Sequence, residues 1–117
     1  MSYVDGFIIP VHKDRLEDYR ALARLGAEVF KDHGALAVVE CVGDDVPYGT
    51  LTSFPRSVQA TEDEVVVFSW IIHASREARD ATNAKAMADE RLKECMTNPP
   101  FDGKRMIWGG FVPFLEA

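Results

Sequence analysis

The feature that most constrains the fold is an apolar stretch at residues 64–74, which has the pattern of a β-strand without a polar face. Valine, isoleucine and aromatic side chains dominate this stretch, and strands favour these residue types. Alternate side chains of a strand point to opposite faces of its sheet, so a half-exposed strand alternates apolar and polar residues. This strand should therefore lie in a sheet that is covered on both faces. One side carries Val66, Phe68, Trp70 and Ile72, and the other carries Val65, Val67, Ser69 and Ile71.

Capping and turn signals divide the rest of the chain. Asp14, followed by Glu17, predicts a helix start with a capping box, and Gly34 predicts its left-handed end. Ser75 predicts the N-cap of a second helix. The connection at 44–63 is too long to lack structure. We predict strands at 3–11, 35–42, 64–74 and 104–114 and helices at 14–33 and 76–96. Residues 50–53 and 57–60 should form short strands or an extended arm around Pro55.

This order, strand–helix–strand twice in tandem, is typical of the ferredoxin-like α+β fold, and we predict one such domain over residues 1–117. A stripe of small residues would let the second helix lie close to the antiparallel sheet. The two predicted helices can cover one face of the sheet, and no other predicted element remains to cover the second face. A homodimer with its sheets packed face to face solves this, as does a cleft for an apolar ligand, and the two can coexist. The stripe comprises Ala78, Ala81, Ala84, Ala88, Leu92 and Cys95 or Met96.

Paired glycines, Gly109 and Gly110, lie within the last predicted strand. Glycine inside a strand indicates a bulge or a place where another backbone approaches closely. We expect one of these two features there.

Composition narrows the class of protein. Hydrophobic residues make up 47% and charged residues 27%, which is typical of a globular chain. A net charge of -6 argues against a nucleic-acid partner, because phosphate neutralisation needs basic side chains. We also expect no signal peptide and no membrane partner, because no apolar run reaches about 18 residues. Cys41 and Cys95 are far apart in sequence, which favours two reduced thiols in a cytoplasmic protein.

Several sequence words along the chain resemble the YbaA-like family, small bacterial proteins of unknown function. The resemblance covers nearly the whole chain and implies a dimeric α+β barrel, in which two ferredoxin-like subunits oppose their sheets. One departure is at 112–114, where an acidic residue was expected after the glycine pair and phenylalanine. The words are YVDGF at 3–7, ECVGDDVP at 40–47, TSFPR at 52–56, VVFSWI at 66–71, MAD at 87–89, FDGKRM at 101–106 and GGF at 109–111.

The resemblance implies no activity. The wider superfamily includes cofactor-free monooxygenases, haem-degrading enzymes, dehalogenase-like proteins and stress-response proteins, and this range is fold analogy that identifies no function. Some family members carry a label referring to signal-recognition-particle RNA. The acidic balance of this chain gives that label no physical support.

An acidic group follows the second predicted strand. Glu40 stands in an otherwise apolar row, and Asp44 and Asp45 come just after it. A carboxylate in an apolar site can have a raised pKa and act as a general base or bind a ligand. The alternative is structural: the two aspartates bond in the turn, and Glu40 pairs with Arg56 or Lys104.

Basic and aromatic residues supply the remaining ligand-binding candidates. Arg56, Lys104 and Arg105 could clamp an anionic ligand, or could neutralise the nearby acids instead. Trp70 and Trp108, with Phe68, are natural pocket walls, although tryptophans at such positions also serve as core or interface residues.

Histidine spacing gives no metal motif, so we expect neither a metal nor another cofactor. Among the histidines, His73 at the end of the central strand is a weak acid/base candidate beside Glu40. The sequence thus favours a homodimeric small-molecule-binding or stress-response protein. The alternatives are a cofactor-free monooxygenase or isomerase that uses Glu40 or His73 as base, and a structural partner that binds through an edge strand.

Overall fold

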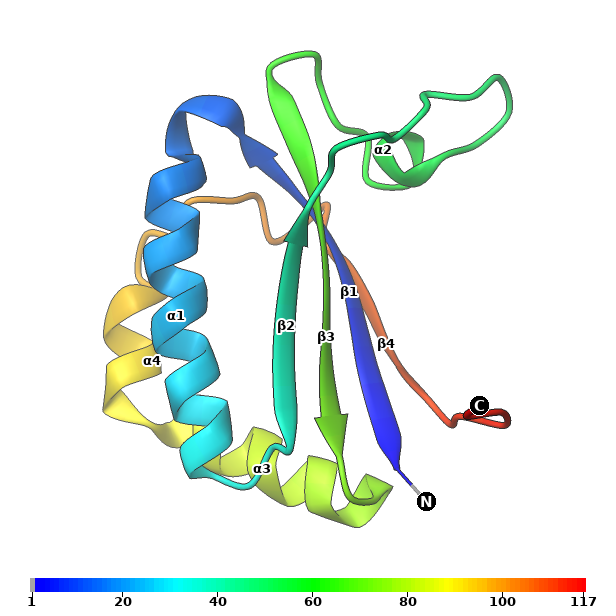
Figure 1. Cartoon of the computed structure of the whole chain (residues 1–117). Helices are drawn as coiled ribbons and strands as arrows, with labels where there is room; N and C mark the ends of the chain where they lie inside the picture. Colours follow the sequence, from blue (N-terminus) through cyan, green and yellow to red (C-terminus); the bar gives the residue numbers. More distant parts are fainter. Residues whose placement is uncertain (1) are drawn as a thin grey trace.

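Strand β3 (Glu64–His73) lies beside β1 (Tyr3–His12) at the centre of a four-stranded antiparallel sheet in the computed structural model, which describes residues 2–117 (Figure 1). The strand order is β2-β3-β1-β4, with the main helices on one face, and this confirms the predicted ferredoxin-like α+β fold. No helix in residues 2–117 is long and apolar enough to cross a membrane. The other elements are η1 (Lys13–Arg15), α1 (Leu16–Asp32), β2 (Ala37–Val42), α2 (Phe54–Ser57), α3 (Arg76–Ala88), α4 (Glu90–Cys95) and β4 (Ile107–Phe111).

Strands β1 and β3 pair along their whole length, from Tyr3 opposite His73 to His12 opposite Glu64. Their side chains divide between the two faces as the alternation predicts. Toward the helices, Ile9, Val11 and Val67 form a buried core with Tyr19 of α1. On the other face, the side chain of Phe68 remains 44% exposed in the single chain. Here α2 contributes Phe54, whose ring centroid lies 5.8 Å from that of Phe68.

The start of the first helix differs from the prediction. Asp14 is not the N-cap, because it lies inside η1, and the ring Nδ1 of His12 accepts the hydrogen bond from its backbone N–H at 3.2 Å. The strand therefore runs directly into the turn, and its last side chain performs the capping. The predicted end is confirmed: Gly34 has φ +122°, a conformation that favours glycine.

The second helix is interrupted, so the prediction of one helix over 76–96 was wrong. Asp89 has extended backbone angles, φ -75° and ψ 126°, and ends α3. Its carboxylate then accepts the backbone N–H of Arg91 and caps α4, while also contacting His33 Nε2 at 2.8 Å. The alanine part of the predicted stripe was also wrong, because α3 buries Thr82 and Ala86 while Ala81, Ala84 and Ala88 are exposed; the stripe member Leu92, in α4, is buried. Ala78, the first member of the stripe, is partly buried.

The long connection contains a helical turn, α2, which includes Pro55, instead of the predicted short strands at 50–53 and 57–60 or an extended arm. Ser53 caps it by accepting the backbone N–H of Arg56 at 3.1 Å, and Pro55 occupies the first turn. Both residues favour helix starts, so local sequence chemistry decided this segment. The last strand covers Ile107–Phe111, which is shorter than the predicted 104–114.

Gly110 explains the paired glycines of the last strand. It lies opposite Asp5 in a regular ladder, so there is no bulge at this position. A Cβ atom here would overlap the hydroxyl of Tyr3 and Nη2 of Arg79, which are hydrogen-bonded to each other at 3.0 Å. The glycine therefore makes room for two side chains, where we had expected a bulge or a second backbone.

Substituting Gly110→Ala should lower the free energy of unfolding by about 1–3 kcal/mol, because the Tyr3–Arg79 contact must move to admit the methyl group. Urea denaturation measures this. Gly26→Ala is the matched control, since no atom lies within 4 Å of its added Cβ and alanine is the better helix former. It should raise stability by about 0.5–1 kcal/mol. Equal stability of wild type and Gly110→Ala would contradict the steric argument.

Candidate functional site

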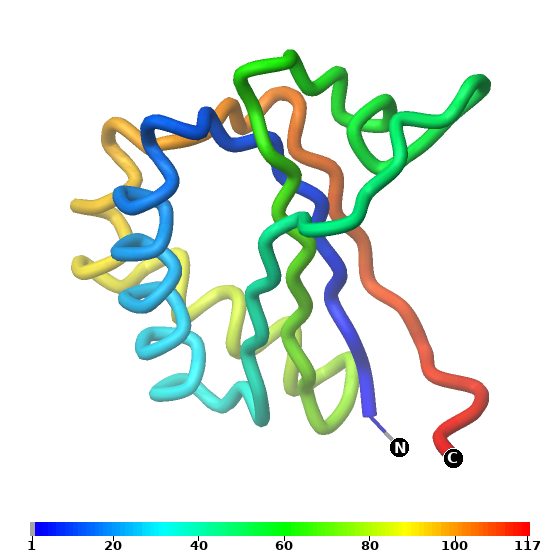
Figure 2. The backbone as a smooth tube through the Cα atoms, turned by 45° about the horizontal axis from the view of Figure 1, so that its top comes forward, coloured from blue at the N-terminus to red at the C-terminus, as the bar shows by residue number. Residues whose placement is uncertain are grey.

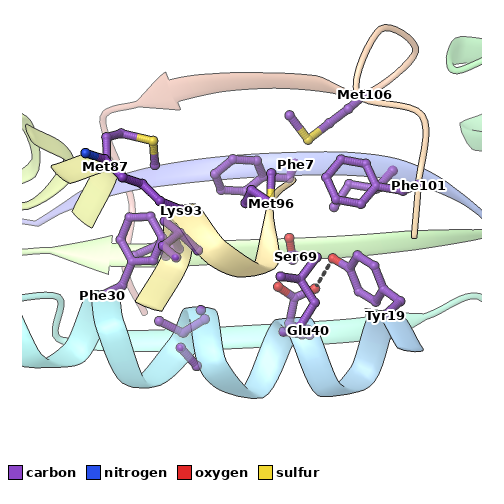
Figure 3. Close-up of a pocket in the computed structure, with 18 residues that line it drawn as sticks. Phe7, Tyr19, Phe30, Glu40, Ser69, Met87, Lys93, Met96, Phe101 and Met106 are labelled. Carbon is purple, nitrogen blue, oxygen red and sulfur yellow. Dashed lines mark hydrogen bonds between the residues drawn. The ribbon is translucent and has the colours of Figure 1, made fainter. Parts of the chain in front are cut away.

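A pocket of about 330 Å³ lies between the sheet and helices α1 and α4 (Figure 3). It exists because α1 presents small residues, Ala23, Gly26 and Ala27, where larger side chains would reach the sheet. Its walls are almost entirely apolar and include aromatic rings and flexible thioethers. These are Phe7, Phe30, Phe101, Met87, Met96 and Met106.

Polar groups converge at one corner of this pocket. The Tyr19 hydroxyl of α1 donates a hydrogen bond to Glu40 Oε1 of β2 at 2.7 Å. Ser69 of β3 is the direct ladder partner of Glu40 and is only 3% exposed. Its hydroxyl takes no part in the Tyr19–Glu40 bond. A ligand in the pocket would meet a carboxyl and a hydroxyl side by side.

The surroundings change the acidity of both bonded groups. Burial among apolar walls raises the pKa of Glu40, and the hydrogen bond from Tyr19 partly opposes this rise. Burial, with the nearby Glu40 charge, also raises the pKa of Tyr19, so its phenol remains a protonated donor. Glu40 as a whole is nevertheless an exposed residue of the single chain, because β2 is an edge strand, and it also borders an outer groove beside Arg20 and Arg24.

Glu40 is the one predicted ligand-binding residue that lines this pocket. The proposed partners Arg56 and Lys104 do not pair with it, so that part of the structural alternative was wrong. Asp44 and Asp45 border a separate hollow of about 220 Å³ beside Phe54 and Phe68.

Trp70 lies on the face of the sheet opposite the pocket, where its ring centroid is 5.5 Å from that of Phe68. Arg56 braces the long connection: its Nε donates to the carbonyl of Tyr48 at 3.0 Å, and its Nη2 donates to the carbonyl of Gly49. Its guanidinium also stacks 3.9 Å above the Tyr48 ring centroid. The arginine therefore shapes the connection.

The remaining basic candidates do not form a clamp. Arg105 donates to both oxygens of Glu64, at 2.7 and 2.6 Å, and to Asp102 at 2.9 Å. Arg105 thereby lowers the pKa of Glu64 to about 2. Lys104 is exposed, and Trp108 on edge strand β4 is 60% exposed. Arg105 thus neutralises nearby acids, which was the alternative considered for it.

His73 lies outside the pocket and is fully buried. Its Nε2 is 3.3 Å from Asp5 Oδ2, and Arg79 Nε is 3.2 Å from Asp5 Oδ1. Burial lowers the pKa of His73, and the charge of Asp5 opposes this effect. This cluster anchors α3 to the sheet, and its histidine and aspartate are too deeply buried to contact a ligand. Within residues 2–117, no group of three or more histidine, cysteine, aspartate or glutamate residues could hold a metal ion.

Three polar lining residues, Tyr19, Ser69 and Lys93, were missed as site residues. Tyr19 belongs to the apolar stripe of a helix, which made it an ordinary core residue. Ser69 interrupts an apolar strand, as Glu40 does, and this shared exception was the available signal. Their meeting depends on strand pairing that sequence periodicity does not supply.

Tyr19→Phe should raise the pKa of Glu40 further, because it removes the hydrogen bond that stabilises the carboxylate. Carbon-13 NMR titration of the Glu40 side-chain carboxyl measures the shift. Tyr48→Phe makes the same atomic change in the connection, away from Glu40, and should leave this titration unaltered. A Glu40 pKa that stays constant in Tyr19→Phe would show that the bond does not tune it.

Comparison with known proteins identifies a family and relatives that are similar to this chain in sequence. Residues 2–103 match the protein family described as "Protein of unknown function (DUF1428)". The chain is 51% identical over 116 residues to "Uncharacterized protein YbaA" of Escherichia coli strain K12, covering 99% of each. The protein of the same name from Shigella flexneri gives the same identity and coverage.

Solved structures of lower identity share the fold. Rv0793 from Mycobacterium tuberculosis has a TM-score of 0.50 and 15% identity, covering 100% of this chain and 99% of that one. The "Putative antibiotic biosynthesis monooxygenase from Nitrosomonas europaea" has a TM-score of 0.50 and 13% identity, covering 97% and 90%. A designed protein, Foldit4, has a TM-score of 0.51 and 15% identity, covering 97% and 99%. At these identities the likeness concerns the fold alone.

Proposed function

We propose that this chain, which belongs to the DUF1428 family of proteins of unknown function, forms a homodimer and binds an apolar small molecule. The observation that carries the binding function is the apolar pocket with its Glu40–Tyr19 corner. Its volume of about 330 Å³ falls in the range of small-molecule sites. Few polar groups in an apolar cavity fix the orientation of a ligand, and this pocket has that composition. A stress-response role is one setting for such binding.

Pocket closure tests the binding function. Ala23 lines the pocket, so Ala23→Phe should fill it and reduce binding of a hydrophobic fluorescent dye at least about tenfold. Ala21 lies on the exposed side of the same helix, and Ala21→Phe should leave the affinity within about twofold. Fluorescence titration measures both. Dye binding that survives Ala23→Phe would place the dye elsewhere and count against this pocket.

The homodimer is supported by the sheet face opposite the helices. Phe68, Ile107 and Phe111 on this face are 44%, 43% and 62% exposed in the single chain. Burying apolar surface stabilises by about 25 cal/mol per Å², so a second copy laid on this face would gain several kcal/mol before entropic costs. A two-fold axis would bring this face against the same face of a second copy, which is the arrangement of isologous dimers.

Two segments on the same side of the sheet also favour a partner (Figure 2). The connection that carries α2 exposes Leu51 at 90%, and the C-terminal segment exposes Phe114 at 98% and Leu115 at 75%. Both segments extend away from the sheet on the side opposite α1. In a dimer they would pack on the neighbouring subunit, which accounts for apolar side chains that the single chain leaves in water.

Light scattering after size exclusion should give twice the chain mass of 13.1 kDa. Phe68→Glu should shift the protein to monomer, because it places a charge at the centre of the proposed interface. Leu36→Glu is the control: Leu36 is 55% exposed between α1 and β2, away from that face, so the dimer should persist. A wild-type monomer at micromolar concentration would refute the dimer.

The second candidate is a cofactor-free enzyme of monooxygenase or isomerase type that uses the same pocket. The raised pKa of Glu40 favours it, because a carboxyl with a pKa closer to neutrality is a more effective general base. His73 is no longer a comparable candidate, since its side chain has no exposed surface. Chemical conversion of a bound molecule would separate this role from binding alone.

We also propose a cytoplasmic location. Cys41 and Cys95 are both free thiols and both partly buried. Unpaired cysteines are typical of reducing compartments, where disulfides rarely persist.

A further inference from the structure

We propose that the pocket selects its ligand by a hydroxyl group, phenolic or alcoholic, which is bound between Glu40 and Ser69. This inference rests on the proposed binding function and names the chemistry of the molecule that is bound. It predicts that neutral apolar alcohols and phenols are preferred over hydrocarbons and over carboxylates of the same shape.

Strand register provides the first argument. Glu40 and Ser69 are direct partners across the antiparallel β2–β3 ladder, so their side chains stand side by side, with Cβ atoms about 4.5–5.5 Å apart. Tyr19 already donates to Oε1 of Glu40, which leaves Oε2 for a donor from the ligand. The Ser69 hydroxyl can donate or accept. A ligand hydroxyl satisfies both positions at once, since it donates to Glu40 and accepts from Ser69.

The distribution of charge provides the second argument. Lys93, the cationic residue that lines the pocket, lies beside Met87 and Phe30, away from the Glu40–Tyr19 corner (Figure 3). A carboxylate bound at that corner would place a second negative charge next to Glu40 in apolar surroundings, which is strongly unfavourable. A hydrocarbon would cover Glu40 and Ser69 without replacing their hydrogen bonds to water. A carboxylate and a hydrocarbon should therefore both bind less tightly than a molecule with a hydroxyl group.

The walls near this corner favour flat or conformable molecules. Rings of Phe7 and Phe101 flank it, with Phe101 edge-on to Tyr19 at a centroid distance of 6.0 Å. The thioethers of Met96 and Met106 adjust readily to different shapes, as methionine does in other apolar sites. A fused two-ring hydrocarbon skeleton is a suitable probe, because the same skeleton is available with each polar group.

The test compares 2-naphthol, naphthalene and 2-naphthoate by fluorescence titration of the full-length protein at neutral pH. We expect 2-naphthol to bind at least about tenfold more tightly than naphthalene or 2-naphthoate. Only 2-naphthol can donate a hydrogen bond to the Glu40 carboxyl. Glu40→Gln keeps the side-chain shape and removes the charge, so the preference for 2-naphthol over 2-naphthoate should fall at least about tenfold. Glu62→Gln, at an exposed residue outside the pocket, should preserve the preference.

The outcomes separate the two proposals. If none of the three compounds binds the wild-type protein, or if Ala23→Phe leaves their binding intact, the pocket is not the binding site and the proposed function fails. If the compounds bind in the pocket with affinities within about twofold of each other, or 2-naphthoate binds most tightly, the binding function stands and hydroxyl selection is wrong. A preference for 2-naphthol over 2-naphthoate that persists in Glu40→Gln also overturns the assigned role of Glu40.

Discussion

The full-length pairing of β1 with β3 is the constraint on which the rest of the structure depends. It aligns Tyr3 with His73 and His12 with Glu64, and thereby sorts the side chains of both central strands onto two apolar faces. The helices use one face for the core and the pocket. The other face remains apolar in the single chain, and this unbalanced sheet is the physical reason to expect a second subunit.

Two polar clusters occupy the helix-facing side of this sheet and have different consequences. Asp5, His73 and Arg79 pack together and anchor α3, and the contact of Arg79 with Tyr3 requires a glycine beside it in β4. Glu40 and Ser69 instead line the pocket that the small residues of α1 leave open. Packing density therefore separates an anchoring cluster from a candidate site, although both consist of ionisable or hydroxyl side chains in apolar surroundings.

Glu40 was identifiable from sequence because an acid in an apolar strand row is unusual and costly to bury. Its assigned partners were basic residues, since opposite charges are the usual remedy. The structure uses Tyr19 instead. This residue lies on helix α1, 21 residues before Glu40, and it is recognisable as a partner only once α1 is docked on the sheet. Arg56 and Arg105 were attractive ligand contacts for the same reason, yet backbone carbonyls and nearby acids already engage them.

The sequence by itself determined the order of strands and helices, the two-faced central strand and the helix ends marked by Ser75 and Gly34, because these follow from periodicity and local capping chemistry. Only the tertiary structure decided where the pocket lies and which residues meet there. Ser69 reaches Glu40 through β-ladder register, and Tyr19 reaches it through the docking of α1. Both depend on contacts between residues distant in sequence, which local patterns do not encode.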